Sequence, residues 1–128
     1  MAIEVGMTGT AETVVTKELT ALAAGSGSLE VLATPHMTAL MERAAWTLVQ
    51  PHLDEGKTTV GTKLSVEHTA ATPVGMMVRA TATVTAVEGK KITFAVTAED
   101  ARGEIGRGTH ERAIVTEESF LKRTYDKL

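Results

Sequence analysis

The sequence predicts an α+β fold in which one long helix packs on an antiparallel sheet of about five strands. The first observation is a helical spacing of apolar residues from Met37 to Leu48, directly after Pro35. The second is the alternation of apolar and polar residues in four later segments, which is typical of half-buried strands. The third is the short, turn-rich connections between those segments, which favour antiparallel neighbours.

The composition is that of an ordinary globular domain. The chain has 128 residues, of which 43% are hydrophobic and 23% charged, so we expect one domain spanning residues 1–128 with a genuine core. Aromatic residues make up 3% and the net charge is -3, which gives neither a stacking platform nor a basic face for nucleic acid. The lack of cysteine excludes thiolate catalysis and disulfides.

The segment MAIEVGMTGTAETVV carries acidic residues where a secretory signal has basic residues and then an apolar run. The chain also has no run of 18 or more apolar residues, so we expect no membrane span. The expected location is the cytoplasm.

In the first half of the chain, a strand is expected from about Thr8 to Val15, and the Gly-Ser-Gly core of LTALAAGSGSLEVL predicts a loop or mobile lid. Thr34 is expected to be the N-cap of the long helix, with Pro35 at its first position and its end between Gln50 and Gly56.

The helix start also has the features of a ligand site. A capping box would place Glu or Gln at position 37, where Met37 stands. The backbone amides near His36 and Met37 are therefore expected to be free to face an anion or a developing oxyanion.

In the second half, strands are expected at about 58–68, 76–87, 90–99 and 104–115, and a short helix capped by Thr116 at the end. A hairpin turn is expected at Glu88-Gly89. In the first of these strands Thr58, Val60, Thr62, Leu64, Val66 and His68 share one parity, so all six are expected to face the apolar side.

The order of one strand, one long helix and four strands matches the topology of the hotdog fold. One face of such a sheet and one of its edges need cover, so we expect a homodimer, with a higher homo-oligomer as the alternative.

Three polar residues stand out near the helix and the following strand: Thr34, Glu42 and His68. A hydroxyl can attack or position, a carboxylate can act as base or nucleophile, and an imidazole can move a proton near neutral pH. Each also has an ordinary structural interpretation, respectively a helix cap, a solvated helix residue and a core histidine. If Glu42 is instead buried near a subunit boundary, its carboxylate is desolvated, which suits a general base.

A metal site is not expected. The four histidines show no two-His spacing such as HExxH, and there is no cysteine to complete a ligand set.

Three short segments of the sequence resemble those of a known protein family. VLATPHMTALME at 31–42, TVGT at 59–62 and VEHTAATPVG at 66–75 resemble the fluoroacetyl-CoA thioesterase-like family of hotdog proteins, over nearly the whole chain. The resemblance implies a catalytic set of Thr34, Glu42 and His68, which keep the family's intervals of eight and twenty-six residues.

The resemblance also implies substrate-binding roles. Gly61 in TVGT corresponds to a glycine that lets the backbone approach the substrate, a role that suits a strand glycine. Arg112 in THERAIV corresponds to an arginine implicated in substrate contact, the alternative being a solvated strand arginine, and His68 is expected to touch substrate as well. The fluoroacetyl-specific member resembled here has gating phenylalanines before the helix, whereas AAGSGSLEV in this chain has no aromatic residue.

The function implied is hydrolysis of an acyl-CoA thioester, without a cofactor, at a site completed by helix and strand residues of two subunits. Glu42 is then a base or a nucleophile, Thr34 attacks or orients, and His68 serves the leaving thiolate. The phosphates of CoA require cations, for which Lys57, Lys63, Arg79 and Arg112 are the candidates. The alternatives are a non-catalytic acyl-CoA or small-acid binding protein and a hotdog dehydratase.

Overall fold

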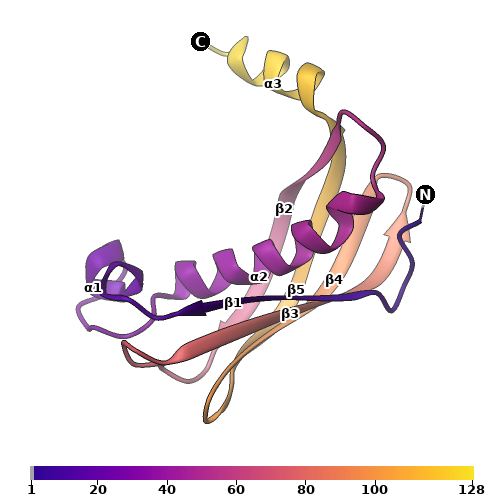
Figure 1. Cartoon of the computed structure of the whole chain (residues 1–128). Helices are drawn as coiled ribbons and strands as arrows, with labels where there is room; N and C mark the ends of the chain where they lie inside the picture. The colour runs from indigo at the N-terminus through magenta and orange to yellow at the C-terminus, as the bar shows by residue number, and fades with distance from the viewer. Residues whose placement is uncertain (1) are drawn as a thin grey trace.

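The computed structural model, which describes residues 2–128, contains one five-stranded antiparallel sheet with the long helix lying across one face (Figure 1). The strands are β1 (Thr8–Val14), β2 (Lys57–His68), β3 (Met77–Glu88), β4 (Lys91–Asp100) and β5 (Gly103–Thr116). Their order across the sheet is β1-β3-β4-β5-β2, with every neighbouring pair antiparallel. The expected α+β hotdog arrangement is confirmed.

The helix α2 (Thr34–Val49) packs mainly on β1 and β3, and its apolar stripe forms the centre of the core. The fully buried helix residues face apolar side chains from the middle strands, including Ile92 and Phe94 of β4. The helical spacing in the sequence therefore identified most of the buried face, which holds Met37, Leu40, Met41, Ala44, Ala45 and, in place of the half-buried Leu48, Val49.

The start of α2 differs from the prediction by one residue. Ala33 is the N-cap, and Thr34 is already the first helical residue, with Pro35 next to it. The Thr34 side chain makes no capping bond, because its hydroxyl is used by a side chain outside the helix.

The segment expected to be a loop or lid contains local structure. The 3-10 turn η1 (Lys17–Leu19) leads into this segment, which holds the single helical turn α1 (Ala21–Ala24). Thr20 caps that turn by accepting a hydrogen bond from the amide of Ala23, and Gly25 closes it in the left-handed conformation at φ 73°. In Figure 1 this segment lies beside the beginning of α2.

The single parity expected for β2 is wrong in the first half of the strand. The pairing with β5 shifts between Gly61 and Lys63, so Thr62 is the extra residue of a β-bulge. Thr59 and Gly61 lie on the inner face before the bulge, and Leu64, Val66 and His68 lie on it afterwards. The prediction that His68 points inward with Leu64 and Val66 agrees with this register, whereas Thr58, Val60 and Thr62 belong to the other face.

The remaining elements are the 3-10 turn η2 (Gln50–His52), which follows α2, and the terminal helix α3 (Glu117–Tyr125). Thr116 occupies the N-cap position of α3, as expected, although its side chain makes no capping bond. Figure 1 shows α3 projecting from the end of β5, away from the sheet. None of the helices within residues 2–128 has the length and apolarity needed to cross a membrane.

Candidate active site

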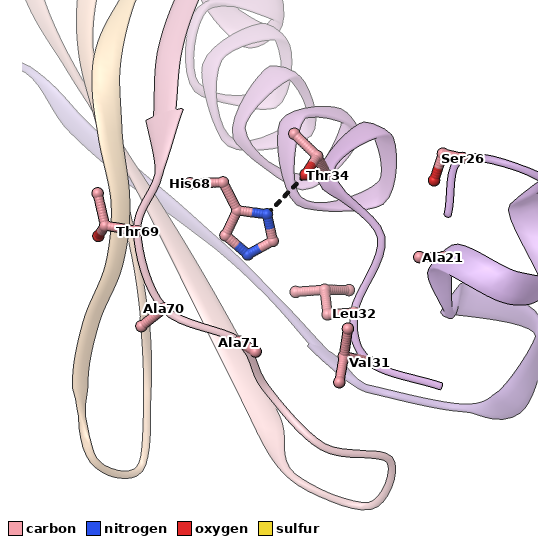
Figure 2. A pocket seen from close by; sticks show the side chains of 9 residues that line it. All are labelled: Ala21, Ser26, Val31, Leu32, Thr34, His68, Thr69, Ala70 and Ala71. Atoms are coloured by element: carbon pink, nitrogen blue, oxygen red, sulfur yellow. Dashed lines mark hydrogen bonds between the residues drawn. The ribbon is translucent and has the colours of Figure 1, made fainter. Parts of the chain in front are cut away.

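The beginning of α2 and the end of β2 bring two of the predicted site residues together. Thr34, the first residue of α2, and His68, the last residue of β2, form a hydrogen bond of 2.8 Å between Oγ1 and Nδ1 (Figure 2). Met37 packs one turn further along the helix against Gly106, the residue paired with His68 in the sheet. This packing sets the distance between the first turn of α2 and the strand pair that carries His68.

The other ring nitrogen of His68 is unsatisfied. Nε2 is buried and has no hydrogen-bond partner among residues 2–128. Burial lowers the pKa of His68, and the backbone of Ala70 opposes this shift more weakly. The ring is therefore neutral at neutral pH, with one nitrogen on Thr34 and the other ready for a ligand.

A cavity of about 300 Å³ adjoins this pair. Figure 2 shows Thr34 and His68 on one side of it and Ala21 and Ser26, from the segment before α2, on the other. Its remaining walls come from the residues just before α2 and just after β2, namely Val31, Leu32, Thr69, Ala70 and Ala71. Apart from His68 no wall residue is ionisable, so the cavity suits a small uncharged group.

The helix amides expected to be free are already bonded. The amides of His36 and Met37 both donate to the carbonyl of Ala33, each at 3.0 Å. The prediction that they face a ligand is therefore wrong, because the N-cap lies one residue earlier than expected.

The third predicted residue, Glu42, lies further along α2. It stands eight positions after Thr34, an axial distance of about 12 Å along the helix. Its Oε2 lies 3.3 Å from Nη1 of Arg112 and 4.0 Å from Nε2 of His110, and its side chain is 41% exposed. Within one chain the three predicted catalytic residues are therefore not together. Thr34 contacts His68, whereas Glu42 contacts Arg112.

Arg112 is a buried arginine, not the solvated one that the sequence left open. Its side chain is 7% exposed, and its Nε and Nη2 donate to the hydroxyl and the carbonyl of Thr59, at 2.8 and 3.0 Å. Burial lowers the pKa of Arg112, and the carboxylate of Glu42 opposes this shift. The guanidinium is the fixed partner of Glu42.

Gly61 makes this arrangement possible. A Cβ atom at Gly61 would lie 2.5 Å from Oε2 of Glu42 and 3.3 Å from Nη1 of Arg112. The close approach that a strand glycine predicts is therefore made by the carboxylate of Glu42 within the chain.

His110 lies beside Glu42 and Arg112. From the sequence it was weighed only as a possible metal ligand, so its position next to these two residues was not predicted. His110 and Arg112 are two residues apart in β5, and this strand spacing places both side chains on the inner face. That shared parity is the signal that could have revealed the cluster.

The cations proposed for CoA phosphates lie away from the cavity. Arg79 is paired with Glu12 at 3.0 Å, Lys57 donates to Thr116 at 3.2 Å, and neither these nor Lys63 line the cavity. Within residues 2–128 no three His, Asp, Glu or Cys side chains gather closely enough to hold a metal ion.

A helix packed across a five-stranded antiparallel sheet is the hotdog arrangement, which this chain shares with solved thioesterases. The chain belongs to the family described as fluoroacetyl-CoA-specific thioesterase, FlK, whose profile matches residues 15–118. The resemblance seen in the sequence is thus confirmed, and the protein is a thioester hydrolase.

A curated relative, the fluoroacetyl-CoA thioesterase of Streptantibioticus cattleyicolor, is 44% identical over 98 residues, which are 77% of this chain and 70% of the relative. The solved structure of the fluoroacetyl-CoA thioesterase FlK matches with a TM-score of 0.94 and 36% identity, over 100% of this chain and 99% of that one. A variant of FlK solved with acetyl-CoA matches with a TM-score of 0.93 and 37% identity, over 98% of each chain.

Proposed function

We propose that this protein hydrolyses a short acyl-CoA thioester to the free acid and CoA, using Thr34, His68 and Glu42. The observation that carries the proposal is the hydrogen bond between Thr34 and His68 beside a small, uncharged cavity. A thioester carbonyl in that cavity lies within reach of both side chains. In the reaction, water adds an oxygen to the acyl carbon, the carbon–sulfur bond breaks, and the thiolate leaves with a proton.

The proposed role of His68 follows from its two nitrogens. When Nδ1 accepts the hydroxyl proton of Thr34, Nε2 carries the ring proton and directs it into a site without a protein partner. A buried, unpaired N–H is a donor suited to the leaving sulfur. Thr34 then orients the ring and the substrate, or attacks the carbonyl with His68 as its base.

Glu42 supplies the negative charge of the proposed site. It acts either as the base that activates water or as a nucleophile that forms an acyl anhydride. The two routes differ in the fate of solvent oxygen. In the anhydride route, water that attacks the glutamyl carbon leaves ¹⁸O in the Glu42 carboxylate after a single turnover, whereas the general-base route leaves all of the label in the product acid.

A homodimer is part of the proposal, because one chain keeps Glu42 about 12 Å along α2 from Thr34. β2 lies at one edge of the sheet, where its strand partner within residues 2–128 is β5 alone. If β2 of a second copy pairs with it antiparallel about an axis near Ser65, His68 of one copy lies beside Gly61 of the other. Gly61 adjoins Glu42, so this pairing brings the three groups together.

The dimer is tested by replacing Ser65, which is exposed on β2. The chain has no cysteine, so Ser65→Cys introduces a single thiol. Under oxidation we expect a disulfide-linked dimer that stays active on dilution, while Thr85→Cys, on β3, does not cross-link. A wild-type protein that is fully active as a monomer would contradict the shared site.

The substrate proposed is a short acyl group without strict selection for fluorine. The cavity wall formed by the segment before α2 contains Ala21 and Ser26 and no aromatic side chain. Acetyl-CoA and propionyl-CoA are therefore expected to be turned over at rates comparable to fluoroacetyl-CoA, since small hydrophobic differences discriminate weakly.

The chemistry is tested by following release of the CoA thiol from fluoroacetyl-, acetyl-, propionyl-, isobutyryl- and benzoyl-CoA. Glu42→Gln and His68→Ala are each expected to lower kcat by about 10²- to 10⁴-fold. Glu88→Gln, at the end of β3, and His52→Ala are matched exposed controls. Tight binding without thiol release would identify a binding protein, and wild-type rates in both variants would overturn the assignment of residues.

A further inference from the structure

A buried histidine outside the proposed catalytic trio stands behind Glu42. His110 lies in β5, paired with Leu64 of β2 and with Phe94 of β4. It is 1% exposed, and its ring stacks on that of Phe94 with centroids 5.9 Å apart. The imidazole is therefore fixed in place by packing on one face.

The hydrogen bonds of His110 define which nitrogen carries the proton. Nδ1 lies 2.8 Å from the carbonyl oxygen of Lys63, which only accepts, so Nδ1 donates. Nε2 lies 3.1 Å from Nη1 of Arg112, which only donates, so Nε2 accepts. The pattern requires a neutral ring with the proton on Nδ1.

Arg112 is bonded at all three of its nitrogens. Thr59 takes Nε and Nη2, and Nη1 is shared between Nε2 of His110 and Oε2 of Glu42. His110 is thus the group that aims the Nη1 end of the guanidinium at the carboxylate.

Loss of the acceptor at His110 leaves a buried N–H of Arg112 without its second partner, which costs free energy. The guanidinium then shifts to recover a bond, and Glu42 moves with it. A protonated imidazole has the same effect, because it directs an N–H at a cation; burial lowers the pKa of His110 and keeps the ring neutral.

We propose that His110 is a positioning residue for thioester hydrolysis, which accepts a hydrogen bond from Arg112 and so holds Glu42 at its working angle. The inference rests on the function proposed above for Glu42. His110 does not line the cavity beside Thr34 and His68, so its contribution is to turnover and not to substrate affinity.

Two substitutions of His110 separate its two hydrogen bonds. Glutamine reaches far enough to place an amide oxygen near the position of Nε2, whereas asparagine reaches only the position of Nδ1 and keeps the donor to Lys63. We expect His110→Gln to retain kcat within about threefold and His110→Asn to lower it by on the order of 10- to 100-fold, with KM unchanged in both. His52→Asn, at an exposed histidine, is the control.

A double-mutant cycle with Glu42→Gln tests whether His110 acts through the carboxylate. In that background His110→Asn is expected to cause no further loss of kcat. Equal rates for His110→Asn and His110→Gln, or a loss that persists beside Glu42→Gln, would overturn the inference alone. Wild-type turnover of Glu42→Gln itself would instead overturn the proposed function and the inference with it.

A measurement on the unmodified protein keeps the test independent of how well the variants fold. Nitrogen-15 NMR of the histidine rings is expected to show His110 with a protonated Nδ1 and an unprotonated Nε2 at neutral pH. The opposite tautomer, or a charged ring, contradicts the role of Nε2 as acceptor.

Discussion

The position of Thr34 relative to the helix start decides what its hydroxyl does. An N-cap threonine uses its oxygen on the amides of the first turn, and that is the role expected from the sequence. Here Ala33 is the N-cap and its carbonyl takes the amides of His36 and Met37. The hydroxyl of Thr34 is therefore available to His68.

Substitutions at Thr34 distinguish the two roles. Thr34→Val keeps the shape and removes the hydroxyl, and we expect kcat to fall by on the order of 100-fold while Thr34→Ser retains most of it. Thr34→Val loses the exposed hydrogen bond to His68 but no helix-capping bond, so only a small fall in melting temperature is expected. A cap residue would instead cost about 1 kcal/mol of stability, so a clear destabilisation without loss of rate contradicts the proposed role.

Gly61 gives a second prediction at the scale of one residue. The Cβ atom of Gly61→Ala meets Oε2 of Glu42 at 2.5 Å, so the carboxylate has to move. A displacement of about 1 Å is expected to lower kcat by on the order of 100-fold. Thr62→Ala, at the exposed neighbouring position, is the control, and steady-state kinetics on acetyl-CoA make the comparison. An unchanged kcat in Gly61→Ala shows that the carboxylate position does not matter.

At the scale of elements, the bulge in β2 determines which residues face α2. Without an extra residue at Thr62, strict alternation would place Gly61 and His68 on opposite faces of the sheet. The bulge lets Thr59 and Gly61 face Glu42 and Arg112 while His68 faces Thr34. One strand thus serves both groups of the site.

The packing of α2 on β5 gives a prediction for this scale. A Cβ atom in Gly106→Ala meets the backbone oxygen of Glu67 in β2 and Sδ of Met37 in α2, both at 2.7 Å, so the end of β2 and the start of α2 are displaced from one another. Overpacking of this kind costs about 1–3 kcal/mol, and we expect a loss of activity as Thr34 separates from His68. Gly9→Ala meets Cβ of Leu48 at 2.9 Å near the other end of the helix and serves as the matched control.

Thermal denaturation and kinetics on both glycine variants make this comparison. Both are expected to be destabilised, and Gly106→Ala should show the larger loss of kcat at a temperature where each is folded. Equal losses would mean that activity follows stability and not the height of the helix start.

At the scale of the whole molecule, one buried and one half-buried histidine, His110 and His68, stand in surroundings that disfavour their charge. Burial lowers the pKa of His68 and of His110, so both bind protons less readily in the folded chain than in the unfolded chain. The unfolded imidazole titrates near a pKa of about 6.5. Stability is therefore expected to be constant well above that pH and to fall as the pH drops through it.

Urea denaturation at about pH 7.5 and 5.5 measures this effect, since 5.5 lies below the ordinary pKa of imidazole and above those of the carboxylates. The unfolding free energy should be lower at the more acidic pH, and His110→Gln should reduce the difference. His52→Gln, at an exposed position, should leave it unchanged. An unfolding free energy of the wild type that rises on acidification would contradict the expectation that His68 and His110 are neutral in the folded chain.

The strong periodic signals were read correctly from the sequence, because they depend on burial of one face. The apolar stripe of α2 and the alternation in β3, β4 and β5 are dictated by contact with a common core. The parity of the first half of β2 was not predictable, because a bulge depends on how two strands twist against one another. The parity of His110 with Arg112 marks the inner face of β5, but their contact with Glu42 exists only once β5 lies between β4 and β2 under α2.

The sequence by itself determined the fold class, the family and the residue types of the proposed site, since these are carried by local periodicity and by motifs of adjacent residues. Only the tertiary structure decided the grouping of those residues. Thr34 and His68 are 34 positions apart and Glu42 and Arg112 are 70 apart, and their contacts depend on the register of β2 and the height of α2 above the sheet. Such distances follow from the packing of side chains between elements, which no local pattern encodes.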